Sequence, residues 1–290
     1  MARILCVGIA TLDLVFTVDH YPREDEEMRA QSLRVTRGGN AANTAVVLAR
    51  LGHQVAFAGV LAAAEETAIL VRDFQQHGVD TAPCVVRPGK PPTSSILLAP
   101  SGSRTIVHYR DLSEFGCEDF ARLDLAAYDW VHFEGRNPDT LACMLDHLRR
   151  HHARLPLSLE AEKPRPGLAA LFDRCNVLLT GRAFARALGH GEPRAFLQAL
   201  RAQAPRPLIF AGWGETGAWA LPGSEAPLYT PAFPPPRVVD TVGAGDTFNA
   251  GVIHGVLNGW PVDRTLREAA SLAGRKCGQV GFSLVPTPGP

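Results

Sequence analysis

Short apolar runs alternate with helix-length segments along most of this chain, and no other feature restricts its fold as strongly. Strand-like runs occur at residues 4–9, 55–60, 130–133, 157–159, 177–180 and 208–211. Helical segments occur at residues 40–51, 65–77, 140–152, 167–172, 193–202, 246–257 and 262–277. An alternation of this kind predicts an α/β protein whose parallel sheet is covered by helices on both faces.

Two stretches interrupt the alternation. Residues 11–37 contain strand-like pieces around a charged loop, and residues 94–109 read as a hairpin with its turn at residues 100–103. We expect both stretches to be antiparallel and to form one small sheet that stands off the main body as a lid. The predicted body comprises residues 1–10, 38–90 and 112–290, and the predicted lid comprises residues 11–37 and 91–111.

The composition excludes several classes of protein. The chain has 29 basic and 29 acidic residues, so it lacks the excess positive charge typical of proteins that bind nucleic acid or an anionic membrane. With 46% hydrophobic and 20% charged residues it is expected to be globular, and no apolar run approaches the ~18 residues of a membrane span. Its six cysteines are scattered, and its first residues enter a strand with no room for a signal peptide. We therefore expect reduced, mostly buried thiols, a cytoplasmic location, and a disordered proline-rich tail at residues 286–290.

The strongest motif is the glycine-rich stretch at residues 240–251, which leads into a predicted helix. Gly243 and Gly245 permit a tight turn and a close backbone approach, and the helix start presents unpaired N–H groups to an anion. Asp246 would repel an anion that is merely bound, but it suits a base that takes a proton from an attacking hydroxyl group. Alternatively, the stretch is a plain glycine turn in which Asp246 caps the helix. A Rossmann fingerprint is disfavoured because its third glycine would fall at Phe248, and the chain has no P-loop motif.

A second glycine pair, Gly38 and Gly39, precedes another predicted helix. Asn40 and Asn43 share a face near the start of this helix, and their carboxamides can both donate to and accept from the hydroxyl groups of a polyol. The competing interpretation is a capping Asn40 with a chance polar neighbour. Asp13 lies in an apolar strand, so it is either exposed at a sheet edge or directed at a ligand.

Three further features carry weaker signals. His147 and His151 have a spacing that can suit a metal, but the two arginines between them would repel a cation, so a solvated surface is favoured. Residues 213–217 follow a predicted buried strand and, taken alone, read as a loop. The acidic residues 24–27 read as a solvated face.

Together, the two glycine-rich motifs resemble the two signatures of the ribokinase-like (pfkB) carbohydrate kinase family. The signatures are Gly38-Gly39-Asn40-x-x-Asn43 and Asp240-Thr241-x-Gly243-Ala244-Gly245-Asp246. Longer strings resemble the ketohexokinases (hepatic-type fructokinases) within this family, at residues 21–25, 101–106, 134–137, 162–165 and 233–241. The resemblance covers residues 4–282 and implies a three-layer α/β/α sandwich with a mostly parallel central sheet and a small β-sheet lid.

The resemblance also implies a role for individual residues. Asp246 matches the catalytic base, and the anion hole matches Gly243, Ala244 and Gly245. Positions that hold the sugar match Asp13, Gly39, Asn40, Asn43 and Arg104. Positions around adenine and ribose match Gly214, Glu215, Thr216, Gly217, Phe233 and Thr241. Asp25 matches a residue that reaches the partner subunit's sugar site in a homodimer clasped through the lids.

The chain departs from the family pattern in two places. Many family members carry an Asn-x-x-Glu motif that helps to organise Mg²⁺, whereas this chain has Thr180-Gly181-Arg182-Ala183 at the corresponding place. Ketohexokinases also tend to lack the motif, so the magnesium ligands stay unassigned. The tail after Phe282 does not match, which leaves open a K⁺ site formed by C-terminal carbonyl groups.

The resemblance thus implies a kinase that uses ATP and Mg²⁺ to phosphorylate a ketohexose, foremost D-fructose to fructose 1-phosphate. A related kinase for ribose, a ketogluconate, a nucleoside or the 6-hydroxyl of fructose is one alternative. A non-catalytic sugar or nucleotide sensor on the same fold is another. The intact Asp246 argues against the sensor, because a sensor needs no base.

Overall fold

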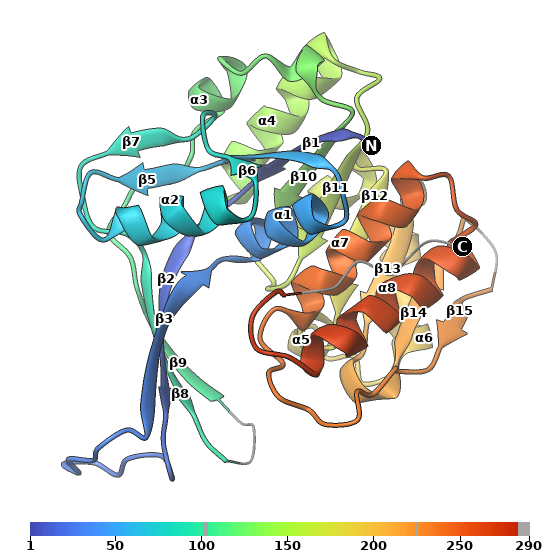
Figure 1. Cartoon of the computed structure of the whole chain (residues 1–290). Helices are drawn as coiled ribbons and strands as arrows, with labels where there is room; N and C mark the ends of the chain where they lie inside the picture. Colours follow the sequence, from blue (N-terminus) through green and yellow to red (C-terminus); the bar gives the residue numbers. More distant parts are fainter. Residues whose placement is uncertain (101–103, 224–225, 284–290) are drawn as a thin grey trace.

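The centre of the protein is a nine-stranded sheet, described in a computed structural model that covers residues 1–100, 104–223 and 226–283 (Figure 1). Its strands lie in the order β15-β14-β13-β12-β11-β10-β1-β4-β6. They are β1 (Arg3–Val7), β4 (Gln54–Ala58), β6 (Val79–Asp80), β10 (Trp130–Glu134), β11 (Leu157–Ala161), β12 (Val177–Gly181), β13 (Leu208–Gly212), β14 (Ala218–Leu221) and β15 (Leu228–Thr230). The pairings from β6 to β13 are parallel, and β14 and β15 add an antiparallel edge. The predicted, mostly parallel sheet is confirmed.

Helices cover both faces of this sheet and complete three layers (Figure 1). One face carries α1 (Asn40–Arg50), α2 (Thr67–Gln76), α7 (Ala244–Leu257) and α8 (Val262–Cys277). The other carries α3 (Cys117–Ala121), α4 (Pro138–His151), α5 (Arg182–Ala187), α6 (Pro193–Gln203) and the 3₁₀ segments η1 (Leu125–Ala127) and η2 (Leu168–Arg174). Each layer buries its own hydrophobic core against the sheet, as expected for strands that are apolar on both faces.

Two glycines fix the position of α7, the helix that follows the strongest motif. A Cβ atom at Gly251 would lie 2.8 Å from the Ala269 Cα, and one at Gly255 would lie 2.7 Å from the Thr265 Oγ1. The missing side chains therefore let α8 pack directly on α7. This contact holds the start of α7 at the carboxyl edge of the sheet, where ligands bind in open α/β proteins.

The lid is a separate four-stranded sheet in the order β3-β2-β8-β9. Its strands are β2 (Thr11–Thr17), β3 (Ser32–Gly38), β8 (Thr93–Leu98) and β9 (Arg104–Tyr109). The predicted hairpin is confirmed for β8 and β9, which are antiparallel, while residues 101–103 of its turn lie outside the described residues. The purely antiparallel expectation is wrong, because β2 and β8 are parallel: the chain returns to the body between them, so both strands leave it in the same direction. Part of that return is a small parallel pair, β5 (Val60–Ala62) and β7 (Val85–Arg87).

Some expectations fall outside what the structure tests. The predicted disordered tail lies beyond residue 283 and is not among the described residues. The exact residue boundaries of body and lid stay a prediction. No helix within residues 1–100, 104–223 and 226–283 is both long and apolar enough to cross a membrane.

The cysteines differ from the expectation of reduced thiols. Cys117 on α3 and Cys143 on α4 form a disulfide with their Cα atoms 5.9 Å apart. The prediction failed because α3 packs against α4, so residues that are well separated in the sequence become neighbours. The other four cysteines are free, two of them buried and two half-buried: Cys6, Cys84, Cys175 and Cys277.

Candidate active site

Asp246 lies in the first turn of α7, buried in the body and 7% exposed. Asn43 on α1 donates a hydrogen bond from its Nδ2 to the Asp246 Oδ2, at 2.6 Å. The residue that precedes the helix is Gly243, with a φ of 80°, and Asp246 makes no capping bond. The alternative that Asp246 is an ordinary helix cap is therefore wrong. Its carboxyl group belongs to a contact between two helices whose sequence positions lie far apart.

The surroundings of Asp246 favour a proton acceptor. Burial raises the pKa of this carboxyl group to about 7, against the hydrogen bond from Asn43, which lowers it. The carboxylates of Glu162 and Glu134 raise the pKa further, and the Arg37 guanidinium lowers it. A base works best when its pKa lies near the working pH, so the site is suited to accept a proton at neutral pH.

Asn40 is directed at a buried glutamate rather than at the helix backbone. The residue that precedes α1 is Gly39, with a φ of 98°, and a Cβ atom there would lie 2.1 Å from the Ile9 carbonyl oxygen. The interpretation of Asn40 as the cap is therefore wrong, because Gly39 takes that place. The Asn40 Nδ2 instead donates to the Glu160 Oε1 at 3.2 Å.

Two glutamates at the ends of neighbouring strands join the site, and the sequence analysis missed both as site residues. Glu134 ends β10, is paired in register with Glu160 on β11, and accepts a hydrogen bond from the Ile9 backbone N–H at 3.1 Å. Glu160 also accepts from the Asn249 Nδ2 at 2.9 Å, while its Oε2 is buried without a hydrogen bond in the described part of the chain. Burial and the neighbouring Asp246 raise the pKa of Glu160 well above its ordinary value. A charged residue at the carboxyl end of each predicted buried strand was the available signal.

Asp13 lies where the lid meets the body. Its strand, β2, is interior to the lid sheet, and the side chain is only 8% exposed, so the edge-exposed alternative is wrong. The Thr11 hydroxyl donates to the Asp13 Oδ1 at 2.8 Å. A Cβ atom at Gly38 would lie 2.0 Å from the Asp13 Oδ2, so the glycine pair leaves room for this carboxyl group. Burial raises the pKa of Asp13, and hydrogen bonds from Thr11 and Ser94 oppose the rise.

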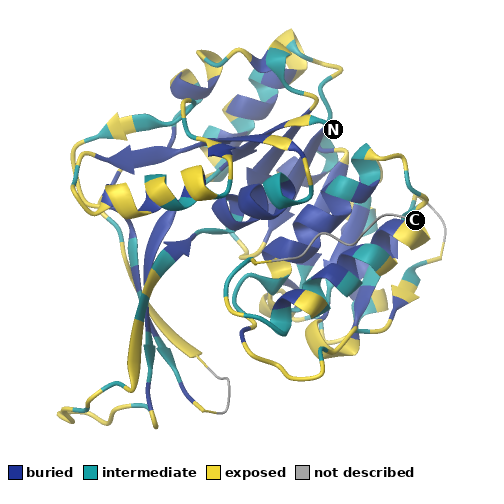
Figure 2. Cartoon of the chain, in the orientation of Figure 1, coloured by how far each residue is buried: buried dark blue, intermediate teal, exposed yellow. Residues whose placement is uncertain are grey.

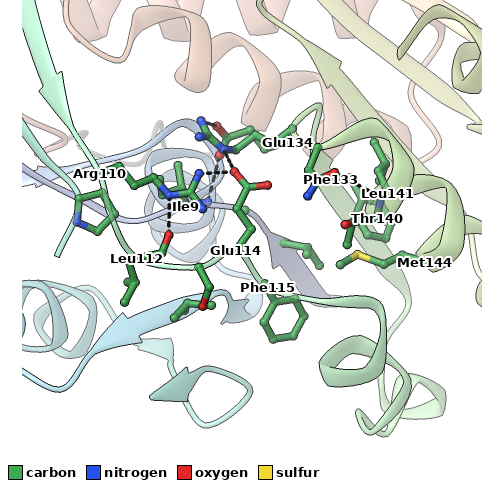
Figure 3. Close-up of a pocket in the computed structure, with 17 residues that line it drawn as sticks. Ile9, Arg110, Leu112, Glu114, Phe115, Phe133, Glu134, Thr140, Leu141 and Met144 are labelled. Carbon is green, nitrogen blue, oxygen red and sulfur yellow. Dashed lines mark hydrogen bonds and ion pairs between the residues drawn. The ribbon is translucent and has the colours of Figure 1, made fainter. Parts of the chain in front are cut away.

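A cavity of about 60 Å³ opens between the base of the lid and the body (Figure 3). Part of its lining is apolar, and another part carries a series of charges of alternating sign. The Arg136 Nε lies 3.4 Å from the Glu114 Oε1, and the Arg136 Nη1 lies 3.3 Å from the Glu134 Oε1. Arg110, which follows β9, also pairs with Glu114. The series links the base of the lid to a glutamate of the site.

The predicted nucleotide residues lie in two loops, one after β13 and one between β15 and α7. Gly214–Thr216 form the short segment η3 after β13, and Gly217 has a φ of 108°. Glu215 is exposed and pairs with Arg182, while Phe233 is 39% exposed and Thr241 is exposed near the start of α7. Both loops lie at the carboxyl edge of the sheet. Among the described contacts, none of these residues forms a hydrogen bond with Asp246.

Two predicted sugar-binding residues lie far from Asp246 of their own chain. Asp25 is exposed, with a φ of 60°, in the loop between β2 and β3. Figure 1 shows this loop at the end of the lid that is remote from α7. Arg104 is exposed at the start of β9, next to residues that the structure does not describe.

The structure also bears on metal ligands. The rings of His147 and His151 lie 4.7 Å apart on α4. The described residues contain no group of three or more histidine, cysteine, aspartate or glutamate side chains that could hold a metal ion.

With this geometry established, comparisons with known proteins agree with one another. The family model described as "pfkB family carbohydrate kinase" matches residues 1–288. A ketohexokinase of Mus musculus is 41% identical over 290 residues, covering 97% of this chain and 97% of its own. A solved structure from Agrobacterium tumefaciens has a TM-score of 0.85 at 24% identity and covers 99% of this chain and 94% of that one. Arabidopsis thaliana ribokinase complexed with ribose and ATP has a TM-score of 0.79 at 20% identity and covers 97% and 94%. The two structural likenesses establish a ribokinase-like α/β fold with a small β-sheet lid.

Proposed function

This chain is a carbohydrate kinase of the pfkB family, and from that premise we propose that it phosphorylates D-fructose at the 1-hydroxyl group. The predictions of the family and of an enzyme are confirmed by the family match and by the similarity to a ketohexokinase. Kinases of this family use ATP. The similarity to a ketohexokinase at 41% identity supports the ketohexose. The observation that carries the proposal is the buried Asp246, with a pKa raised to about 7, at the glycine-led start of α7.

In the proposed reaction Asp246 takes the proton of the attacking hydroxyl group. The first-turn amides contributed by Gly243, Ala244 and Gly245 stabilise the charge on the transferring phosphoryl group. The sugar is held by Asp13, Gly39, Asn40 and Asn43, and Arg104 joins them when the lid closes over the sugar. The nucleotide is held by Gly214, Glu215, Thr216, Gly217, Phe233 and Thr241. The Asn43 Nδ2 has a second hydrogen, so it can donate to a sugar hydroxyl while it remains bonded to Asp246.

The proposed magnesium ion fits the carboxylates at this edge of the sheet. Mg²⁺ in kinases is held mainly by phosphate oxygens and water, with one or two carboxylates. Glu160 suits this role because its Oε2 is buried without a hydrogen bond among the described residues. Bound there, Mg²⁺ would neutralise negative charge on the phosphates.

Potassium does not fit Asp240, the carboxylate that faces the C-terminal segment. The Lys276 Nζ lies 3.2 Å from the Asp240 Oδ2, and backbone N–H groups of Val242 and Gly281 donate to the two carboxylate oxygens. A site formed by carbonyl groups after residue 283 lies outside the described residues. No step of the proposed reaction is therefore assigned to K⁺.

We further propose a homodimer clasped through the lids, in which Asp25 reaches the partner's sugar site. Large apolar side chains exposed on both edge strands of the lid support it, because exposed apolar surface is buried when it contacts a partner. They are Leu33, Val35, Ile106, Val107 and Tyr109, each at least 42% exposed. The site of action is proposed to be the cytoplasm, where ATP is available.

The test is ATP consumption with D-fructose, D-ribose, a 2-ketogluconate and a nucleoside, with Asp246→Asn as the blank. We expect the highest kcat/KM with D-fructose, and a phosphorus NMR signal that identifies the 1-phosphate. Turnover on ribose alone would reject the ketohexose, and a 6-phosphate product would reject the 1-hydroxyl. Binding without turnover would instead favour the sensor.

A further inference from the structure

Arg37, near the end of β3, is a buried cation that the proposed reaction does not use. The residue is 3% exposed, and its guanidinium lies over the rings of Phe74 and Phe282 at 5.3 and 5.6 Å. Its Nε donates to the Asp73 Oδ1 at 2.6 Å, and its Nη1 donates to the Asn43 Oδ1 at 2.6 Å. Because a buried guanidinium is costly unless its donors are satisfied, these bonds hold Arg37 in one orientation.

These bonds decide which way the Asn43 carboxamide faces. A guanidinium can only donate hydrogen bonds, so the atom of Asn43 that faces Arg37 has to be the oxygen. The amide nitrogen then faces the other neighbour and donates to the Asp246 Oδ2 at 2.6 Å. The contacts link Asp73 on α2 to Asp246 on α7, because Arg37 donates to both Asp73 and Asn43, and Asn43 donates in turn to Asp246.

We propose that Arg37 is a positioning residue for the reaction, which fixes the Asn43 carboxamide so that its N–H group orients the Asp246 carboxylate. The proposal rests on the proposed function of Asp246 as the base. Among the described residues, Arg37 forms no hydrogen bond with the base or with the loops assigned to the nucleotide. Its effect on the reaction passes through Asn43 and through its charge.

The charge of Arg37 gives this role a signature that a purely structural residue lacks. Asp246 is faced by Glu134 from β10, by Glu160 from β11 and by Glu162 beyond it, and all three disfavour its ionised form. Arg37 is the cation that opposes them. Removing this cation should make Asp246 harder to ionise, so that activity on the acidic side is lost at a higher pH.

The experiment measures kcat/KM for D-fructose against pH in the wild type, Arg37→Gln and Arg37→Lys. Gln keeps a donor for Asn43 but loses the charge. We therefore expect the acidic limb of its pH profile, where activity falls as the pH is lowered, to move up by about 0.5–1 pH unit. That shift corresponds to a roughly three- to tenfold loss of kcat/KM below pH 6.5, with most of the activity recovered at pH 9. Lys keeps the charge but lacks the planar guanidinium that bonds Asp73 and Asn43 at the same time. The acidic limb of Arg37→Lys should therefore match that of the wild type, while its maximal kcat/KM falls.

A matched control is Arg201→Gln, which removes a guanidinium that is bonded to backbone carbonyls at the far edge of the sheet. It should lower the melting temperature and leave the acidic limb unchanged. If Arg37→Gln does not fold, the pH profile of Asp73→Asn is measured in its place. It removes the negative charge that offsets Arg37, so the acidic limb should move to lower pH.

An acidic limb that stays at the wild-type position in both Arg37→Gln and Asp73→Asn would overturn the proposal. So would the same shift in Arg201→Gln. Failure of this inference is separable from failure of the proposed function. Asp246→Asn would still abolish turnover if Asp246 is the base and Arg37 only packs.

Discussion

The central sheet and the lid sheet use their strands in opposite ways. In the body, β10 and β11 are buried along their whole length between two layers of helices. In the lid, all six residues of β9 are exposed, and β3 has only exposed and half-buried residues except near the body (Figure 2). The body buries most of its apolar residues in two cores, whereas the small lid sheet leaves five large apolar side chains exposed: Leu33, Val35, Ile106, Val107 and Tyr109.

This difference separates two tasks. A site that excludes water needs a rigid floor, and the buried carboxylates of Asp246 and Glu160 lie in the rigid body. The surface that closes over the substrate has to be left uncovered until a ligand or partner arrives. We therefore expect changes in the body to act on catalysis within one chain, and changes in the lid to act between chains.

The largest expected effect is in the body. Asp246→Asn keeps the shape and the oxygen that accepts from Asn43, but it removes the proton acceptor. We expect kcat to fall by about 10²–10⁴, with little change in sugar binding. Steady-state kinetics with D-fructose and direct binding of the sugar test this. Near-full turnover would show that Asp246 is not the base.

The next largest effect is expected at Asp25 in the lid. If Asp25 bonds a sugar hydroxyl in the partner's site, Asp25→Asn should cost about 1.5–3 kcal/mol of transition-state stabilisation, or roughly a ten- to hundredfold loss of kcat/KM. Glu27→Gln, two residues along the same exposed loop, is the control and should stay within about 0.5 kcal/mol of wild type. Equal effects of the two variants would instead support the interpretation of residues 24–27 as a solvated face.

A third prediction concerns the cost of a buried base. Because burial raises the pKa of Asp246 to about 7, the folded state holds a proton between about pH 4 and 7 that the unfolded chain releases. Stability from this group is therefore full below about pH 4 and is lost as the pH rises to 7. Asp246→Asn avoids that loss, so it should be more stable than wild type by about 1–2 kcal/mol at pH 8, and by less at pH 5. Denaturant unfolding at both pH values measures this, and equal differences would contradict it.

The smallest expected effect separates ligand binding from helix capping. Asn40 bonds Glu160 and is not the cap of α1, so Asn40→Ala should weaken sugar affinity by about 0.5–1.5 kcal/mol. Asn258→Ala removes an exposed amide at the far end of α7 and should leave the KM for sugar unchanged. An Asn40→Ala protein with wild-type KM and a lowered melting temperature would contradict a role in sugar binding.

The same contrast shows what the sequence could predict. The periodicity of the body predicted its long helices and its central strands, because those strands are short apolar runs and a helix such as α1 ends beside a glycine, Gly52. The short helices α3 and α5 were not predicted. The edge strands β14 and β15 were not predicted, and neither was the parallel pairing of β2 with β8. Pairing between distant segments depends on where the chain returns, which local patterns do not encode.

The site was predictable where a motif bends the backbone, and not where distant segments meet. Gly39 and Gly243 indicated the starts of α1 and α7 because those turns need a positive φ. Arg37 directly precedes the first signature, but its role could not be predicted, because its partners, Asp73 and Asn43, meet it only in three dimensions. The disulfide between α3 and α4 was missed for the same reason.

In the proposed homodimer, each active site combines Asp246 of one chain with Asp25 from the lid of its partner. The direct test mixes Asp25→Asn subunits with Asp246→Asn subunits, each nearly inactive alone, and verifies that they exchange into heterodimers. One site of each heterodimer then has Asp246 from its own chain and Asp25 from its partner. A statistical mixture should recover about a quarter of wild-type activity, because half of the dimers carry one whole site. Verified heterodimers that stay as inactive as either parent would contradict the account.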